Sequence, residues 1–404
     1  MLNNDLNKEW KINFFKIFSS QSDNPKSMEK ADKDKFEHFP PVIGNFYGEL
    51  LTEESLKKVC DGQLRLKKAK VDENYDDEIV NIDYEKSIKT QLNKLMNEQI
   101  IKLNQEDPTF LTQEEKEVIM GADFPFIKLM TLVYTKDTDQ MTPEDQEEWK
   151  NQMNNFISQQ IVFGVINTYY TMKLYQDNNY VRSFQTPYNK QEIWNKYADN
   201  NRGFCVTYDF KQIKTEVAKN LAKLYPVIYV DKKLEEKDLD YDVNNISAPS
   251  LLKIDSNPSE YDNEWMYIHN HHFTETEYLM LDNLLEPVYT KSINDESIQN
   301  ILTNMYLNED DENNLEYDYK EIIFDVLMVL ESDEFQDKIG DEFDEILKIT
   351  DDFMEIEFMK PEAVYLGTNF PEEKIDEYKE IISSKGIRIF QIKEKEGKLF
   401  KALI

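Results

Sequence analysis

Strand-like and helix-like patterns alternate along this chain. From Phe39 onward, the segments PVIGNFYGELL, TEESLKKVCDG and QLRLKKAKV predict a strand, a helix and a strand. Thr52 suits the start of that helix and Gly62 its end. Residues 180–210 predict a strand, a helical turn carrying Trp194 and Tyr197, a glycine turn at Gly203 and a second strand.

Two long segments, 84–176 and 292–352, have helical periodicity. The clearest helix start is Thr142-Pro143, a cap followed by proline at the first helical position. A helix over 264–285 and a strand EPVYTK are predicted next. The C-terminal part predicts strands at FMEIEFMK and PEAVYLG, then a helix ending near Gly386 and a terminal strand IRIFQIKEK.

These elements predict an α+β fold, with a mixed sheet core and large helical insertions. We expect a polar leader over 1–35, containing one short helix from Trp10 to Ile17 and a linker over 20–35. The remainder, 36–404, is expected to be a single elaborated domain with helical insertions at about 84–176 and 292–352.

Charge limits the classes of partner. The 404 residues include 80 acidic and 47 basic side chains, a net charge of −33. Such a surface repels phosphate backbones and anionic membranes, so we expect neither nucleic acid nor a membrane as partner. A protein with a basic surface, or a small ligand in a local positive pocket, stays compatible with this charge.

Location and cysteine chemistry follow from the apolar segments. The N-terminus is polar and no apolar run approaches the roughly 18 residues of a membrane span, which predicts a cytoplasmic protein. Cys60 and Cys205 lie in apolar patterns, and we interpret both as buried small hydrophobic residues.

The spacing W-x-x-Y-A-D-x-x-x-G, formed by Trp194, Tyr197, Ala198, Asp199 and Gly203, resembles the bacterial family DUF2971, whose function is unknown. Three other blocks resemble it in order: the Phe46-Tyr47 strand through the acidic turn at 72–78, LLEPVYTKS, and MKPEAVYLG with the final helix and strand. The block LLEPVYTKS departs from the family pattern, since neither the Trp nor the Arg of that pattern follows it.

The order of elements is similar to the ADP-ribosyltransferase fold, and this analogy implies an effector that uses NAD. Because families of this kind tend to occur in such settings, we expect a role in phage defence or a toxin-like role. Cleavage of the nicotinamide bond develops positive charge on the sugar, which a carboxylate stabilises. The analogy proposes as catalytic residues Tyr197 and one of Glu275, Glu277 and Glu296, and as cofactor-binding residues Tyr47, Arg65, Arg182 and Trp194.

The same analogy predicts one cleft. The Phe46-Tyr47 strand is expected beside Arg182–Phe184, with Arg65 and Arg182 converging, because an acidic chain can hold phosphates only where its few arginines meet. Packing remains the alternative role for Trp194 and Tyr197.

Two other function classes stay open. One is a catalytically inactive binding module that uses the same pocket or the acidic surface. The weaker one is a metal-dependent hydrolase built on His269, His271 and His272, with His271 and Glu275 one helical turn apart. Asp72–Asp83 resembles the start of a calcium loop but lacks its glycine and its final glutamate, so we predict no calcium site there. The leading interpretation contains no metal site.

Overall fold

The structure is a computed structural model. It describes residues 9–19, 25–69, 93, 97–98, 100–103, 105, 107–122, 125–138, 141–186, 190–211, 215–230, 251–254, 263–272, 274–304, 315–347 and 350–404. The predicted acidic turn at 72–78 and the resemblance to a calcium loop at 72–83 lie outside these residues.

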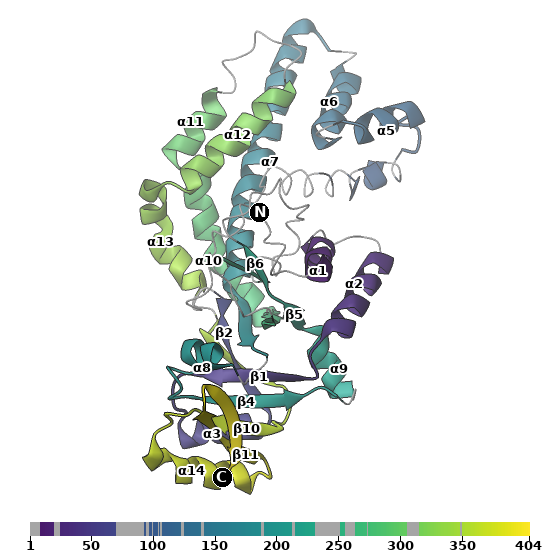
Figure 1. The fold of residues 1–404 in the computed structure, drawn as a ribbon. Helices are drawn as coiled ribbons and strands as arrows, with labels where there is room; N and C mark the ends of the chain where they lie inside the picture. The colour runs from purple at the N-terminus through teal and green to yellow at the C-terminus, as the bar shows by residue number, and fades with distance from the viewer. Residues whose placement is uncertain are drawn as a thin grey trace. The chain divides into compact units, whose positions relative to one another are not determined.

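The chain forms two compact units (Figure 1). The sheet unit comprises Met1–Asn81, Gln176–His271 and Asp351–Ile404, and the helical unit comprises Ile82–Tyr175 and His272–Thr350. Strands and helices occur together, which confirms the α+β class. Most residues of the two predicted insertions, at about 84–176 and 292–352, fall within the helical unit.

Two five-stranded sheets form the sheet unit. The first has the order β1 (Val42–Tyr47), β4 (Phe204–Asp209), β10 (Ala363–Leu366), β11 (Arg388–Lys395) and β12 (Lys398–Leu403). The second has the order β5 (Leu224–Pro226), β8 (Trp265–Asn270), β3 (Asn179–Phe184), β2 (Gln63–Lys68) and β9 (Phe353–Glu357). A separate parallel pair joins β6 (Ile228–Val230) to β7 (Leu252–Ile254).

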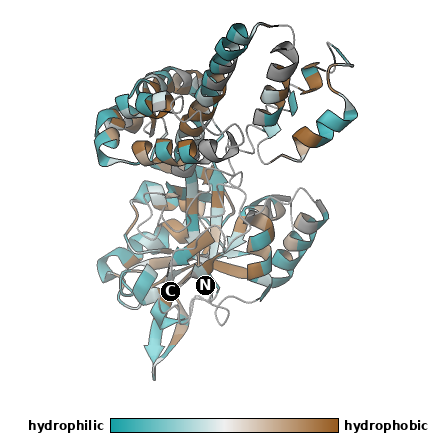
Figure 2. Ribbon diagram, turned by 90° about the horizontal axis from the view of Figure 1, so that it is seen from above, coloured by the Kyte–Doolittle hydropathy of each residue, from teal (hydrophilic) through white to brown (hydrophobic). Residues whose placement is uncertain are grey.

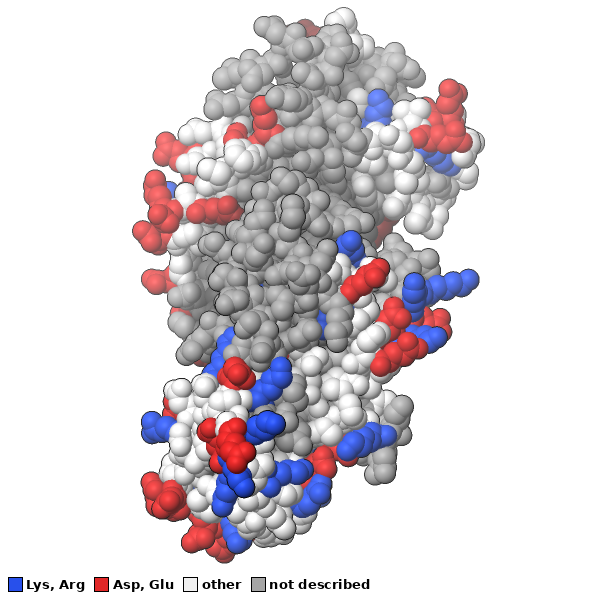
Figure 3. Space-filling view, viewed as in Figure 1, with Lys and Arg blue, Asp and Glu red and all other residues white. Residues whose placement is uncertain are grey.

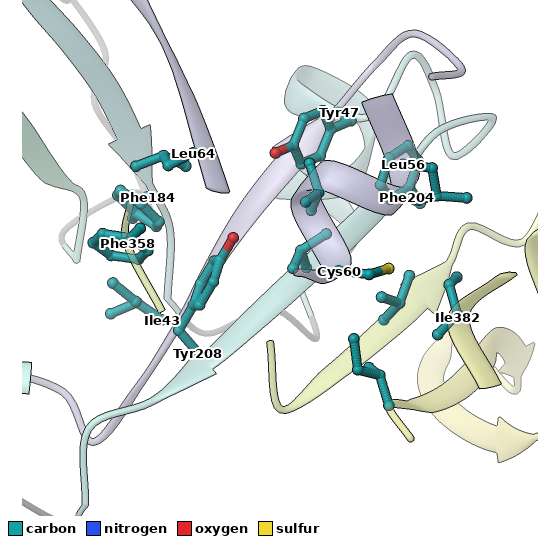
Figure 4. Packing of buried hydrophobic residues seen from close by; sticks show 14 of the residues in the cluster. Ile43, Tyr47, Leu56, Cys60, Leu64, Phe184, Phe204, Tyr208, Phe358 and Ile382 are labelled. Carbon is teal, nitrogen blue, oxygen red and sulfur yellow. The ribbon is translucent and has the colours of Figure 1, made fainter. Parts of the chain in front are cut away.

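One apolar layer is shared by the two sheets. It joins Tyr208 of β4 to Phe184 of β3, with Phe358 stacked on Phe184 at a centroid distance of 5.6 Å (Figure 4). Helices α3 (Glu53–Cys60) and α14 (Glu372–Ser384) add their apolar faces to this layer. Alternation along each strand sends every second side chain into it.

Each sheet buries its other face as well. On the first sheet, α8 (Gln191–Tyr197) packs Trp194 against Phe46. On the second, α1 (Glu9–Ser19) packs Phe14 and Phe15 against Met266. Each sheet therefore packs against other elements on both sides, and β4 and β10 of the first sheet are buried almost throughout. Strand β2 of the second sheet keeps a partly exposed polar face at Gln63, Arg65 and Lys67.

The helical unit is built around α7 (Pro143–Asp177), the predicted helix that begins with proline. The other helices are α5 (Gln113–Met120), α6 (Pro125–Thr138), α10 (Glu275–Ile293), α11 (Glu296–Asn304), α12 (Leu315–Leu330) and α13 (Asp333–Leu347). Ile161, Val165 and Tyr169 of α7 lie in the core of this unit. Teal and brown residues alternate along these helices in Figure 2.

The N-terminal region differs from the expected leader. The short helix is confirmed as α1, but α2 (Pro25–His38) occupies the predicted linker. Lys35 explains part of this difference, because its ammonium group lies 4.8 Å from the ring centroid of Tyr225 and is almost fully buried. Helix α2 is therefore anchored on the sheet unit, and its polar composition misled the prediction.

The middle of the chain also differs from the prediction. Strand β8 lies where a helix over 264–285 was expected, and the predicted strand EPVYTK lies inside α10. A capping box between Thr274 and Glu277 starts α10. Leu281 and Val288 are buried on the same face of the helix, two turns apart, and this burial favours the helix through Pro287. The repeated apolar spacing outweighed the local strand propensity of Val288 and Tyr289.

The segment 180–210 has the predicted order of elements, but its two strands belong to different sheets. Strand β3 pairs with β8, and β4 pairs with β1 and β10. Between them, Asp199, Asn200 and Asn201 have positive φ angles of 43°, 50° and 69°. Asn and Asp tolerate this left-handed conformation better than most residues, which explains the composition of the turn.

At Gly203 the backbone approaches its neighbour closely. A Cβ atom at this position would lie 1.9 Å from the Tyr47 carbonyl oxygen, whereas one at Gly48 would meet only ordinary contacts beyond about 3.5 Å. We expect Gly203→Ala to destabilise the sheet unit by about 3 kcal/mol or more, because backbone atoms must move apart. The matched control Gly48→Ala should be nearly neutral in urea unfolding, and equal stabilities for the two variants would contradict the close approach.

Candidate functional site

A fork between strands gives the sheet unit its main candidate site. One edge of β3 pairs with β8 from Asn179 to Phe184. The other edge pairs with β2 only at Tyr180 and Val181, and with β1 only through the bridge from Gln185 to Gly44. Beyond Val181, β2 no longer pairs with this edge of β3, and β1 pairs with it only at Gln185. Residues 182–184 therefore lie between the two pairings, beside the opening between β1 and β2 that we call the fork. The predicted adjacency of the Phe46-Tyr47 strand to Arg182–Phe184 is confirmed.

The Arg182 side chain lies in this fork and bonds to β1. Its Nε donates to Asn45 Oδ1 at 2.8 Å and its Nη2 donates to the Phe46 carbonyl oxygen at 3.1 Å. The guanidinium carbon lies 4.6 Å from the ring centroid of Tyr47, a cation–π distance. The positive charge is thus held by neutral acceptors and an aromatic face.

A pocket of about 160 Å³ opens at the fork. Strands β1, β2 and β3 and helix α8 supply its walls. The described lining residues are Phe46, Lys67, Val181, Arg182, Ser183, Gln185 and Tyr197. Two of these seven carry positive charge and none carries negative charge, in a chain with a net charge of −33.

Two polar side chains of the pocket lack partners among the described residues. Lys67 is half-buried, and its ammonium group has no ion pair or hydrogen bond there. Gln185 is 2% exposed, and neither Oε1 nor Nε2 of its amide has a hydrogen-bond partner. Unpaired buried polar groups are rare in folded proteins, because each one loses its hydrogen bonds to water.

Aromatic rings form the wall opposite β3. The rings of Phe46 and Tyr197 lie 6.5 Å apart between centroids, and Phe46 meets Trp194 edge to face at 5.1 Å. Trp194 is completely buried, so it supports Phe46 from behind. Sequence reasoning missed Phe46 as a pocket residue and proposed its neighbour, Tyr47.

A buried charge network adjoins the pocket at Ser183. Lys253 forms an ion pair with Glu264 and donates to Ser183 Oγ at 3.4 Å, while Tyr229 donates to Glu264 at 2.5 Å. Burial alone raises the pKa of Glu264, but Lys253 and the hydroxyls of Tyr229 and Ser183 outweigh it and hold the pKa below its usual value. Glu264 therefore stays ionised, and Ser183 is fixed in place.

The predicted convergence of the two arginines is wrong. Arg182 lines the pocket, whereas Arg65 is not among the described lining residues. Arg65 is exposed, with its guanidinium carbon 3.9 Å from the ring centroid of Phe353. Lys67 supplies the second positive charge at the pocket instead.

The other proposed cofactor-binding residues belong to the interior. Tyr47 is 6% exposed, stacks on Phe204 at 4.7 Å and accepts a hydrogen bond from Asn45. Trp194 is fully buried, so it cannot contact a ligand directly. Of the proposed set, Arg182 and Tyr197 line the pocket.

The three proposed glutamates lie in the helical unit. Glu275 is exposed in the first turn of α10, and Glu277 closes the capping box with Thr274. Glu296 is exposed in the first turn of α11. Acidic side chains are common in the first turn because they complement the helix dipole, and this accounts for their positions.

The histidine cluster does not form the predicted helical pair. His269 belongs to β8, where its Nδ1 lies 3.0 Å from Lys223 Nζ, and α10 begins only at Glu275. Among the residues that the structure describes, no group of three or more His, Cys, Asp or Glu side chains is arranged to hold a metal ion. The two cysteines, Cys60 and Cys205, are buried and unpaired, as predicted.

Residues 193–264 match a family model described as a protein of unknown function, DUF2971. The chain therefore resembles DUF2971, as the Trp194–Gly203 spacing indicated. No curated protein and no solved structure matches the chain.

The DUF2971 region contains two of the features described above. It begins within α8, so Trp194 and Tyr197 lie in it, and it ends with Glu264 of the buried network. Arg182 and Gln185 precede it. Tyr197 of the aromatic wall, Trp194 behind it and the network that fixes Ser183 thus come from the matched region. Phe46 and the polar groups of the fork come from the strands before it.

None of the helices that the structure describes combines the length and apolar character that a membrane crossing requires.

Truncation of Trp194 tests its support of the pocket wall. We expect Trp194→Ala to reduce the free energy of unfolding by roughly 3–5 kcal/mol, because it leaves a cavity behind Phe46. Tyr197→Ala, which removes a half-buried ring, should cost clearly less in the same thermal unfolding experiment. An unchanged melting temperature for Trp194→Ala would exclude it as a core anchor.

The buried network predicts a dependence on pH. Because the folded-state pKa of Glu264 is below its ordinary value of 4.5, its stabilisation is present above that value and is lost as pH falls through the folded pKa. Glu264→Gln leaves Lys253 uncompensated, so we expect a loss of about 3–5 kcal/mol at neutral pH that shrinks in acid.

Glu53, in an exposed ion pair with Lys57, provides the matched control. Glu53→Gln should leave the stability unchanged, because exposed pairs contribute little. Chemical unfolding at several pH values measures both variants, and a stability deficit of Glu264→Gln that is independent of pH would contradict the ionised network.

Proposed function

We propose that the sheet unit binds a small anionic ligand at the fork pocket. The observation that carries this proposal is the local charge: Lys67 and Arg182 line the pocket, and no described lining residue is acidic. Elsewhere on the visible face of the sheet unit, positive and negative side chains are mixed (Figure 3). A ligand anion would give Lys67 the partner that it lacks among the described residues.

The two cations would act differently. Arg182 already bonds to β1, so it contributes a fixed positive potential and the remaining donors of its guanidinium. The Lys67 ammonium group is a compact charge on a flexible stem and can follow the anion. A phosphate or carboxylate at the fork would thus meet one fixed donor and one adjustable donor.

NAD is the ligand suggested by the likeness to ADP-ribosyltransferases, and it fits the proposal as an anion with planar rings. The pocket of about 160 Å³ is smaller than the ~300–1,000 Å³ that encloses a drug-sized ligand. It would therefore enclose one group of a dinucleotide while the rest lies outside. We extend the proposal to an ADP-ribosyltransferase-like arrangement of the sheet unit and to a role of the protein as an effector.

Calorimetric titration with NAD, AMP and inorganic phosphate tests the proposal. We expect Lys67→Met to weaken binding by about tenfold, equivalent to ~1.4 kcal/mol, because the charge-assisted contact is lost. The affinity of the wild-type protein should fall as salt is added. Lys398→Met, which removes an exposed lysine of β12, is the matched control and should bind as the wild type does.

Two results would overturn the proposal. One is the absence of binding by every anion in the panel. The other is equal affinity for Lys67→Met and the wild type, which would place the bound anion elsewhere on the protein.

A further inference from the structure

Gln185 occupies an unusual position in the fork pocket. Its side chain lines the pocket and is 2% exposed, yet both amide atoms lack hydrogen-bond partners. Seven buried side-chain atoms of the described residues have no partner, and two of them belong to this one amide. No other residue that lines the pocket contributes to that set.

The backbone holds Gln185 in place. Its N–H donates to the Gly44 carbonyl oxygen at 2.8 Å, and its own carbonyl oxygen accepts from the Gly44 N–H at 2.9 Å. Gly44 fits tightly here, since a Cβ atom would lie 2.7 Å from Cys205 Sγ. With both backbone groups paired, the only polar atoms that Gln185 can offer a ligand are those of its side chain.

An amide offers a donor and an acceptor side by side. The groups that satisfy both at once carry an acceptor next to a donor, as in a carboxamide, a lactam or the edge of a nucleobase. The neighbouring rings of Phe46 and Tyr197 are suited to contact the face of a planar group. The last torsion of a glutamine side chain has broad minima, so the buried amide can turn toward such a group.

We propose that the fork pocket binds a planar heterocycle through its amide-like edge, with Gln185 as the residue that determines specificity. This inference rests on the proposed function, because Lys67 and Arg182 would hold a phosphate attached to the same ligand. The ligand class is therefore a nucleotide, whose ring is either a nicotinamide or a nucleobase. Gln185 forms hydrogen bonds with the edge of the ring, and Lys67 and Arg182 bind the phosphate.

Calorimetric titration of the full chain, with ligands that have a planar heterocycle and one that lacks it, separates the contribution of the heterocycle to binding from that of the phosphate. The probes with a planar heterocycle are nicotinamide mononucleotide, AMP and UMP, and the probe without one is ribose phosphate. We expect at least one probe with a planar heterocycle to bind the wild type about tenfold or more tighter than ribose phosphate. The tightest probe distinguishes nicotinamide from a nucleobase.

Gln185→Met keeps the length of the side chain and removes the amide. This variant should bind the nucleotides no more tightly than ribose phosphate, so the advantage of the ring is lost, and its affinity for ribose phosphate should equal that of the wild type. Its melting temperature without ligand should stay equal or rise, because an unpaired polar group has been removed. Gln63→Met is the matched control, since Gln63 also has an unpaired buried amide oxygen, on β2, but does not line the pocket. It should retain the advantage of the ring.

A second measurement uses only the wild type and so does not depend on the folding of a variant. The preferred ligand is compared with an analogue in which methyl groups replace every hydrogen of the donor nitrogen, and this analogue should bind about tenfold more weakly. Equal affinity for the two, or an intact advantage of the ring in Gln185→Met, overturns the role of Gln185. If ribose phosphate still binds in a manner that depends on Lys67, the anion site survives that result, and if no probe binds, both proposals fall.

Discussion

The contact of Arg182 with β1 is the interaction on which the arrangement of the sheet unit depends. Arg182 belongs to the second sheet, and its guanidinium donates to Asn45 and to the Phe46 carbonyl oxygen in the first. Only the bridge from Gly44 to Gln185 pairs these two strands through their backbones. The Arg182 side chain therefore connects β3 to β1 where backbone pairing between these strands stops. The space beside this side chain is the fork pocket.

The Trp194–Gly203 turn maintains the other wall of that pocket. Trp194 fixes Phe46, while the left-handed residues Asp199–Asn201 reverse the chain so that Gly203 reaches the end of β1. Asn201 holds the turn to α8 by donating to Asn195 and accepting from Gln191. The spacing that resembles DUF2971 thus has a structural role, because Trp194 and the turn from Asp199 to Gly203 bring α8 against β1.

Local patterns in the sequence predicted the individual helices and strands better than they predicted which strands pair with one another. Thr52, Thr142 and Gly386 act as helix boundaries in the structure because capping depends on a few adjacent residues. The pairing of β3 with β8 joins residues separated by most of a hundred positions, and nothing local to either strand specifies it. For the same reason the sequence predicted that Arg182 and Tyr197 line a pocket but not that Lys67 and Gln185 do.

The arrangement of charges shows why the pocket is positive despite the acidity of the chain. Lys253 also lies close to Ser183, but its charge is neutralised by Glu264 within the core. Lys67 and Arg182 have no described carboxylate partner, and low-dielectric surroundings strengthen the field of such charges. Negative charge on the distant surface is screened beyond about 10 Å at moderate salt, so it cannot cancel that field. The fork therefore combines a positive potential with an unpaired amide and two aromatic rings, and a planar anion would satisfy all of these groups together.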